Sequence, residues 1–256
     1  MNIEQYQNTF CIVTCLFPAL DATRDDNEWL ELFAPLVSSK IPIIIYTTPE
    51  IEIELLSMLI NGQLTVRPLT YFGLFEGLWL YEEVMTAASE RSILDLDVLR
   101  NVLSVRSLGW IHDESIFNPF RCDRFLWVHQ SLIQEISCCY LSDRTLLQSF
   151  NILLNRFLLL YKTEPDGIAR FSDRIFGANR KNLSKINSYY WGAYKKAVSS
   201  GLIPNFDMVI SDVFVERPEL FDRFRLQSNG LEGFLFEGIR QDSVAIEETY
   251  YPNMVL

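Results

Sequence analysis

The sequence predicts a single α/β domain. A length of 256 residues is close to the upper size of one hydrophobic core. Hydrophobic residues make up 49% of the chain and aromatic residues 13%, which is enough for a packed interior. The chain also opens with alternating strand and helix patterns, as a largely parallel sheet covered by helices requires.

The first elements form a βαβ unit. β-branched and aromatic residues make residues 10–16 a strand, and apolar residues recur at helical spacing over residues 29–37. Residues 41–46 are a nearly continuous apolar run, typical of a parallel strand covered on both faces. We expect the crossover between these two strands to be right-handed.

The next elements follow from capping and turn residues. Thr48 and Pro49 open a helix over about residues 50–60, and residues 64–69 form a strand whose Pro68 indicates a sheet edge. Residues 74–112 have mainly helical spacing, and residues 125–128 form a short buried strand.

The second half of the chain is predicted as follows. We expect helix over residues 132–160, interrupted near Ser142, then irregular or strand structure over residues 168–176. Residues 182–199 form an amphipathic helix that ends at Gly201. Residues 206–215 mix strand and helix signals, and the last thirty residues suggest short strands and turns.

Charge and cysteine usage limit the partners. A net charge of −11 repels a phosphate backbone, so we expect no nucleic-acid partner, whereas a local basic pocket can still hold a nucleotide diphosphate. Five cysteines without metal-ligand spacing predict reduced thiols, no zinc site and a cytoplasmic location. No stretch approaches the ~20 apolar residues of a membrane span; peripheral membrane contact stays open.

Several catalytic classes lack their motifs. The sequence has no Gly-x-Ser-x-Gly element, no P-loop and no Gly-x-Gly-x-x-Gly fingerprint, which argues against hydrolases, nucleoside triphosphatases and dehydrogenases. In an open α/β sheet a ligand binds outside the carboxyl ends of the strands. The loops after Cys15, Tyr46 and Val128 are therefore the expected site.

Five segments occur in a recognisable order: IVTCLF (12–17), IPIIIYTTPE (41–50), WIHDESIFNPFRCDRFLWV (110–128), IFGANRKNL (175–183) and GLIPNFDMVISDVFVERPELF (201–221). This order resembles the HtrL/YibB-like family, a group similar to glycosyltransferases of the GT-A fold. The resemblance implies a GT-A-like, Rossmann-like mixed and mostly parallel sheet flanked by helices. It also implies one domain, with a core at about residues 10–222 and the segment 223–256 packed on it.

The function implied by the resemblance is sugar transfer. A nucleoside-diphosphate sugar would be the donor, and a glycan or related acceptor the second substrate, as in polysaccharide biosynthesis. The alternative is a catalytically inactive GT-A-like protein with a binding or assembly role. The sequence does not identify the sugar, the acceptor, the anomeric outcome or the oligomeric state.

The most informative departure from the family pattern is His129, at the position where the family has an acidic residue. Acidic residues there bind Mn²⁺ or Mg²⁺, which neutralises the diphosphate leaving group. A neutral imidazole binds Mg²⁺ poorly. We therefore assign no metal ligand, leave Mn²⁺ or Mg²⁺ open as a cofactor, and predict that His129 is a catalytic donor to the leaving phosphate. The competing interpretation is an ordinary histidine at a strand end.

The second predicted catalytic residue is Asp207. In the family an acidic pair precedes a Pro-x-Leu-Phe ending, and here Asp207 matches the first acid while Met208 replaces the second. One carboxylate suffices as general base in an inverting transfer. The alternatives are Asp212 as the base, or Asp207 as a helix cap.

The remaining predicted residues bind the donor. Thr14 and Phe17 lie at the end of the first strand, which resembles the place where GT-A folds hold the nucleotide base. Thr47 and Arg24, from the loops after the first two strands, are also predicted to bind the donor. A glycine turn at Gly177 would open a helix whose first residues hold the diphosphate next to His129; those residues are Arg180 and Lys181. The competing interpretation is a solvated basic helix start.

Overall fold

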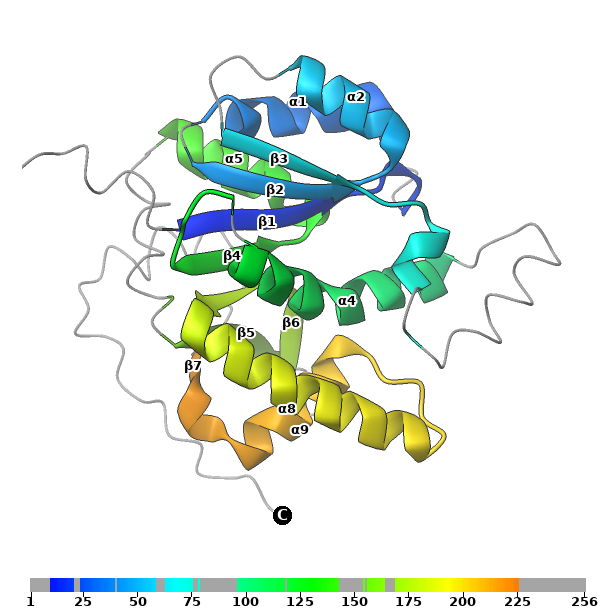
Figure 1. Ribbon diagram of the computed structural model, residues 1–256, viewed down its shortest axis with the longest axis vertical. Coiled ribbons are helices and arrows are strands. Elements are labelled where there is room, and N and C mark those ends of the chain that lie inside the picture. Colours follow the sequence, from blue (N-terminus) through cyan, green and yellow to red (C-terminus); the bar gives the residue numbers. More distant parts are fainter. Residues whose placement is uncertain are drawn as a thin grey trace, which may run out of the picture.

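The computed structural model describes residues 10–20, 24–39, 41–58, 63–75, 78, 96–117, 119–142, 154, 156–163 and 169–225. In this part of the chain seven strands form one sheet in the order β3-β2-β1-β4-β6-β5-β7 (Figure 1). The strands are β1 (Phe10–Leu16), β2 (Pro42–Thr47), β3 (Gln63–Pro68), β4 (Arg124–Val128), β5 (Phe157–Thr163), β6 (Ala169–Asn179) and β7 (Phe221–Arg225).

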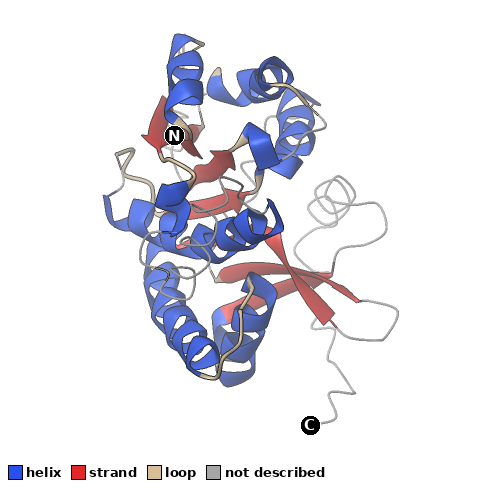
Figure 2. Cartoon of the chain, turned by 90° about the vertical axis from the view of Figure 1, so that its right-hand side faces the viewer, coloured by secondary structure: helices blue, strands red, loops and turns tan. Residues whose placement is uncertain are grey.

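Helices cover both faces of the sheet (Figure 2). One face carries α1 (Asp26–Val37), α2 (Pro49–Ser57) and α5 (Ile133–Ser142), and the other carries α4 (Leu96–Phe117), α8 (Arg180–Ser199) and α9 (Phe206–Glu216). Short 3-10 turns lie at Pro18–Leu20 (η2), Phe72–Phe75 (η3), Gln130–Leu132 (η5) and Pro218–Leu220 (η6). The predicted class, a mixed and mostly parallel sheet flanked by helices in one domain, is confirmed.

The parallel half of the sheet begins with the predicted βαβ unit. β1 pairs in parallel with β2 on one side, where Ile12 lies opposite Ile43, and with β4 on the other, where Val13 lies opposite Trp127. Every residue of β1 is buried, because helices cover it on both faces. β3 is the outermost strand beside β2, as Pro68 indicated.

The direction of β6 decides the geometry of the rest. β6 is antiparallel to β4, so its end at Asn179 lies beside the start of β4 at Arg124. The first half of β6 continues past the carboxyl end of β4, where Val128 pairs with Ile175. β5 pairs with β6 in antiparallel and with β7 in parallel orientation.

Aromatic rings fill the layer between the sheet and α4, α8 and α9. Trp127 lies 6.0 Å from Trp110 and 6.2 Å from Phe176, measured between ring centroids. Phe176 stacks on Phe206 of α9 at 4.9 Å. This chain of rings fixes α4 and α9 against the centre of the sheet.

Helix ends follow the local sequence. Asp25 and Glu28 form a capping box at the start of α1, and Asn205 caps α9 by accepting a hydrogen bond from the Met208 N–H. Gly201 follows α8 with φ of +76°, the left-handed conformation that glycine adopts without strain.

Two predictions of secondary structure are wrong. Residues 157–160 form part of β5 instead of a helix, because the continuous apolar run that begins at Phe157 fits either element and sheet pairing decides. Gly177 lies inside β6 and not in a turn. A Cβ at Gly177 would meet the Phe125 carbonyl oxygen at 2.3 Å, so the glycine permits close approach of β4 and β6.

Candidate functional site

The carboxyl ends of β1 and β4 form the most favourable position for a ligand. From β1 the chain proceeds to β2 and β3 on one side, and it returns to β4 on the other side of β1. This reversal of strand order is a topological switch point, where open α/β sheets bind ligands. Phe17 and His129 are the first residues beyond the two strand ends.

Gln130 joins the two strand ends. Its side-chain oxygen accepts a hydrogen bond from the Phe17 N–H at 2.8 Å, and its amide nitrogen donates to the Phe17 carbonyl at 3.3 Å. Cys15 lies beneath, 3.9 Å from the same amide oxygen. Burial raises the pKa of the Cys15 thiol to about 12, so Cys15 is neutral and unreactive.

His129 directly follows the carboxyl end of β4, at this switch point, and its ring is partly buried. Its Nδ1 accepts a hydrogen bond from the Ser131 N–H at 3.2 Å. Burial lowers the pKa of His129 from 6.5 to about 4; the Asp173 carboxylate opposes this and the Arg174 cation adds to it. The imidazole is therefore neutral near pH 7, and with Nδ1 as acceptor its Nε2–H is a hydrogen-bond donor without charge.

The lowered pKa of His129 makes folding stability depend on pH. Between about pH 6.5 and 4 the unfolded chain binds a proton at His129 that the folded chain does not, so the free energy of unfolding falls as pH falls through this window. Replacing His129→Gln should reduce the loss of stability between about pH 7 and 4.5 by roughly 1–3 kcal/mol, measured by urea unfolding. An equal reduction in His112→Gln would contradict the assignment to His129.

Asp173 is a site residue that the sequence interpretation missed. It belongs to the half of β6 that extends past the end of β4, and its carbonyl accepts a hydrogen bond from Trp127 Nε1 at 3.0 Å. Its carboxylate raises the pKa of both His129 and Cys15, which places a negative charge close to the switch point. No sequence signal marked it, because the direction of β6 decides which edge Asp173 occupies.

Asp207 lies at the same edge of the sheet as His129. The His129 N–H donates to the Arg174 carbonyl at 2.6 Å, and the Phe171 N–H donates to Asp207 Oδ1 at 2.7 Å. The two residues of β6 that make these contacts, Phe171 and Arg174, are three positions apart, which corresponds to roughly 10 Å along the strand. The second carboxylate oxygen is 3.6 Å from Arg170, and the side chain is 22% exposed. Asp207 therefore connects the start of α9 to β6.

Three predicted donor-binding residues expose no surface. Thr14 donates to the Val128 carbonyl at 2.5 Å and Thr47 to the Leu16 carbonyl at 2.5 Å, and both are fully buried. Phe17 is also fully buried and lies 5.9 Å from the Tyr71 ring. The side chains of Thr14, Phe17 and Thr47, which were predicted to bind a nucleotide, connect neighbouring strands or pack in the core.

Arg24 remains on the surface of the candidate site. Its guanidinium donates to the Gln134 side-chain oxygen at 2.9 Å and lies 5.0 Å from the centre of the Trp29 ring. Neither of these two contacts places a carboxylate beside the Arg24 guanidinium. Arg24 thus supplies a cation near the loop that follows β1.

Arg180 and Lys181 lie at the opposite edge from His129. The Arg180 N–H donates to the Asp123 carbonyl at 2.9 Å, just before β4 begins, whereas His129 follows the end of β4. The prediction that Gly177, Arg180 and Lys181 hold a diphosphate next to His129 is wrong, because β6 is antiparallel and delivers the start of α8 to the amino edge.

The described residues contain no group of three or more histidine, cysteine or acidic side chains arranged to hold a metal ion. At the end of β4 the imidazole Nδ1 is used by Ser131 and the Gln130 amide by Phe17. These groups do not fit Mg²⁺, which needs free oxygen ligands. Within the ranges described, no helix has the length and apolar character of a membrane span.

The protein is an open α/β domain, and its candidate site lies at a topological switch point, at the carboxyl ends of β1 and β4. No family model matches the chain, and no curated protein matches it. Among solved structures, mouse xyloside xylosyltransferase 1 in its apo form has 10% identity and a TM-score of 0.47, with 85% of each chain covered.

Two further solved structures are similar to the same degree. 4-Diphosphocytidyl-2C-methyl-D-erythritol synthase from Anaerococcus prevotii has 12% identity and a TM-score of 0.45, covering 92% of this chain and 94% of that one. Core-mannan synthase A from Aspergillus fumigatus, in an Mn/GDP form, has 10% identity and a TM-score of 0.45, covering 84% and 72%. At this distance the similarities assign no reaction or ligand to the chain.

Proposed function

We propose that this chain is a glycosyltransferase that binds a nucleoside-diphosphate sugar at the carboxyl ends of β1 and β4. The observation that carries the proposal is the switch point, with a neutral donor at His129 and a carboxylate close by at Asp173. The motif order shared with the HtrL/YibB-like family supports the same reaction class. The acceptor would be a glycan or related hydroxyl compound.

The diphosphate would need positive charge, because the protein as a whole carries −11. Arg24 and Arg174 both lie at this edge, and Arg174 is exposed. They would offset the charge of the phosphates, while the Nε2–H of His129 donates to an oxygen of the leaving group. A neutral imidazole adds a hydrogen bond without adding charge, so the two arginines carry the electrostatic part.

A carboxylate would accept the proton of the acceptor hydroxyl. Asp207 is the base that the motif order implies; its second carboxylate oxygen lies 3.6 Å from Arg170, and the side chain is partly exposed to an incoming hydroxyl. Asp173 is the second candidate, because its charge acts on His129 itself. No step of this scheme is assigned to a metal ion, since the groups after β4 do not fit Mg²⁺.

Nucleotide binding tests the proposal directly. We expect one of UDP, GDP and CMP to bind with a micromolar Kd in calorimetry, and Arg24→Ala to weaken it by about tenfold, the loss of one charge-assisted contact. Lys196→Ala, at the far end of α8, is the matched control and should bind as the parent does. Repeating the titration with Mn²⁺ measures any contribution of a metal.

A binding or assembly protein that has lost catalysis is the second candidate. The Gln130 amide is committed to Phe17, and Asp207 is committed to Phe171 and Arg170. Both groups therefore have structural roles that need no substrate. A folded sample that binds none of the three nucleotides would favour this candidate over the transferase.

A further inference from the structure

Exposed cationic and apolar side chains gather at the amino edge of β4, away from the candidate site. They come from the end of α4, the loop that precedes β4 and the start of α8. We call this surface the amino-edge patch; it consists of Ile116, Phe117, Arg121, Arg180, Lys181 and Lys185.

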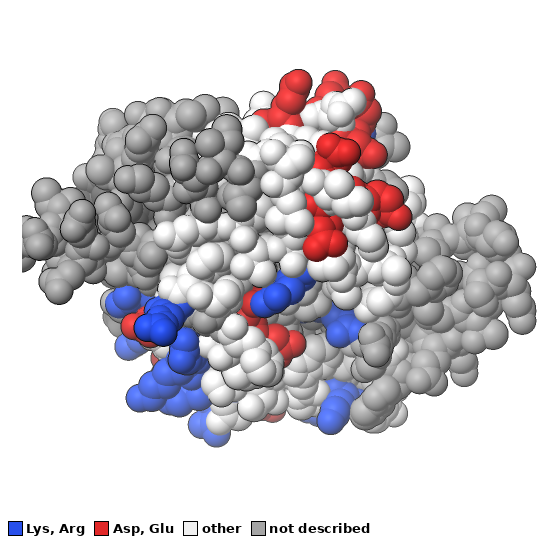
Figure 3. Space-filling model, turned by 45° about the horizontal axis from the view of Figure 1, so that its top comes forward, with Lys and Arg blue, Asp and Glu red and all other residues white. Residues whose placement is uncertain are grey.

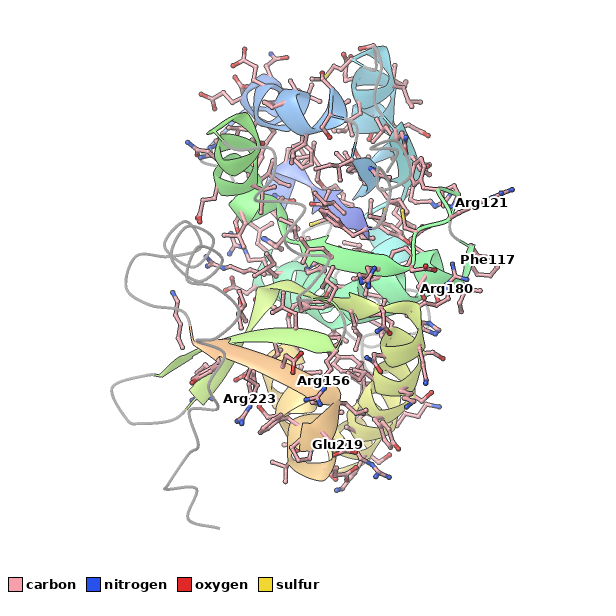
Figure 4. The ribbon with its side chains drawn as sticks, turned by 90° about the vertical axis from the view of Figure 1, so that its left-hand side faces the viewer. Phe117, Arg121, Arg156, Arg180, Glu219 and Arg223 are labelled. Carbon is pink, nitrogen blue, oxygen red and sulfur yellow. The ribbon has the colours of Figure 1, made fainter. Side chains whose placement is uncertain are left out.

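Backbone and side-chain contacts hold the three segments together. The Arg180 N–H donates to the Asp123 carbonyl at 2.9 Å, and the Arg180 guanidinium lies 3.4 Å from the Cys122 carbonyl. Farther from the patch, α4 and α8 also touch: His112 Nδ1 lies 3.1 Å from Asn187 Nδ2. Figure 4 shows Phe117, Arg121 and Arg180 side by side at one corner of the molecule. The patch is therefore a defined part of the fold.

The apolar members of the patch are unusually open to water. Phe117 is 73% exposed and Ile116 is 55% exposed, although they are neighbours at the end of one helix. Arg121 has φ of +57°, a conformation that few residues other than glycine adopt. The loop thus presents a guanidinium, the end of α4 presents an exposed aromatic ring, and Figure 4 shows both side chains directed away from the body of the protein.

The charge of the patch opposes the charge of the molecule. Acidic residues gather over α1 and α2 (Figure 3), whereas α8 has no acidic residue in its whole length. In the described segments that form the patch, the acids are Asp113, Glu114 and Asp123; Glu114 is buried and pairs with Arg67, so the four cations exceed the exposed acids. Two of these cations, Arg180 and Lys181, occupy the first turn of α8, where the helix dipole disfavours positive charge.

We propose that the amino-edge patch binds the surface of a bilayer that contains anionic phospholipids. Cations attract the negative headgroups, and an exposed aromatic and an exposed aliphatic side chain can enter the boundary between headgroups and acyl chains. Exposed Ile116 favours a lipid surface over a nucleic acid, because bases can stack on an aromatic ring such as Phe117 but not on an aliphatic side chain. Bound in this way, the protein turns the opposite edge of β4, with His129, toward water.

Sedimentation with lipid vesicles tests this inference without any reference to catalysis. The parent protein should bind vesicles of phosphatidylcholine with about 30% phosphatidylglycerol, and binding should fall as salt is added. The double variant Arg180→Glu/Lys181→Glu should bind at least about tenfold more weakly, and Phe117→Ser several-fold more weakly. Lys195→Glu/Lys196→Glu reverses two charges at the other end of α8 and should bind as the parent does.

Four results would overturn the proposal. They are absence of binding to the anionic vesicles, equal binding to pure phosphatidylcholine, equal losses in the two double variants, and binding to an RNA oligonucleotide but not to vesicles. Circular dichroism and thermal melting of each variant show that it is folded, so a loss of binding reflects the surface. Because nucleotide calorimetry uses the other edge of the sheet, failure here leaves the transferase proposal to its own test.

Discussion

The Asp207→Asn protein is expected to turn over its sugar donor roughly 10²–10⁴-fold more slowly than the parent while remaining folded. Asparagine keeps an oxygen that can accept the hydrogen bond from the Phe171 N–H, which the carboxylate accepts at 2.7 Å. It removes the charge and the proton-accepting capacity, and it weakens only the contact with a half-exposed Arg170. The substitution therefore separates catalysis from the structural contact.

The measurement is steady-state turnover of whichever donor calorimetry identifies, together with urea unfolding of the same samples. Glu216→Gln is the matched control, because Glu216 is an exposed acid at the far end of the same helix and has no proposed catalytic role. If Asp207→Asn retains full turnover and Asp173→Asn loses it, the base is Asp173. If both variants retain it, neither carboxylate accepts the proton and the mechanism is wrong.

Replacing Gly177→Ala should destabilise the fold by about 3 kcal/mol or more. The added methyl group would lie 2.3 Å from the Phe125 carbonyl oxygen and 2.8 Å from a Leu154 methyl group. The first of these is backbone inside the sheet and cannot move aside without separating β4 from β6. We expect a lower midpoint in urea unfolding with a similar slope.

Gly192 provides the control for this substitution. It lies inside α8, and a Cβ there would meet nothing within 4 Å. Gly192→Ala should stabilise the protein by about 0.5–1 kcal/mol, because alanine has the higher helix propensity. A Gly177→Ala protein within about 1 kcal/mol of the parent would show that β4 and β6 are farther apart than described.

The sequence predicted the parallel half of the fold well. β1, β2 and β4 are short apolar runs rich in β-branched and aromatic residues, and such runs have few alternatives when both faces are covered. Helix ends were also predictable, since Pro49 and Gly201 act through their own backbone preferences. These signals are local, so neighbours in space were not needed.

The direction of strands could not be predicted in the same way. An apolar run has the same pattern whether the strand is parallel or antiparallel, and β6 proved antiparallel. That single fact moved Arg180 to the amino edge and brought Asp173 to the carboxyl edge. The hydrogen-bond partners of the threonine hydroxyls could not be predicted from the sequence either. Thr14 and Thr47 lie at the predicted strand ends, but they donate to carbonyls of adjacent strands.

The amide of Gln130 has a consequence for how far a ligand can descend between the strands. By exchanging two hydrogen bonds with the Phe17 backbone, it acts as one additional rung of the β1–β4 ladder made by a side chain. The Phe17 carbonyl also accepts a hydrogen bond from the Leu20 N–H at 2.9 Å, so both backbone groups of Phe17 are saturated. A ligand therefore binds outside the Gln130 side chain. The groups that recognise it belong to the loops after β1 and β4.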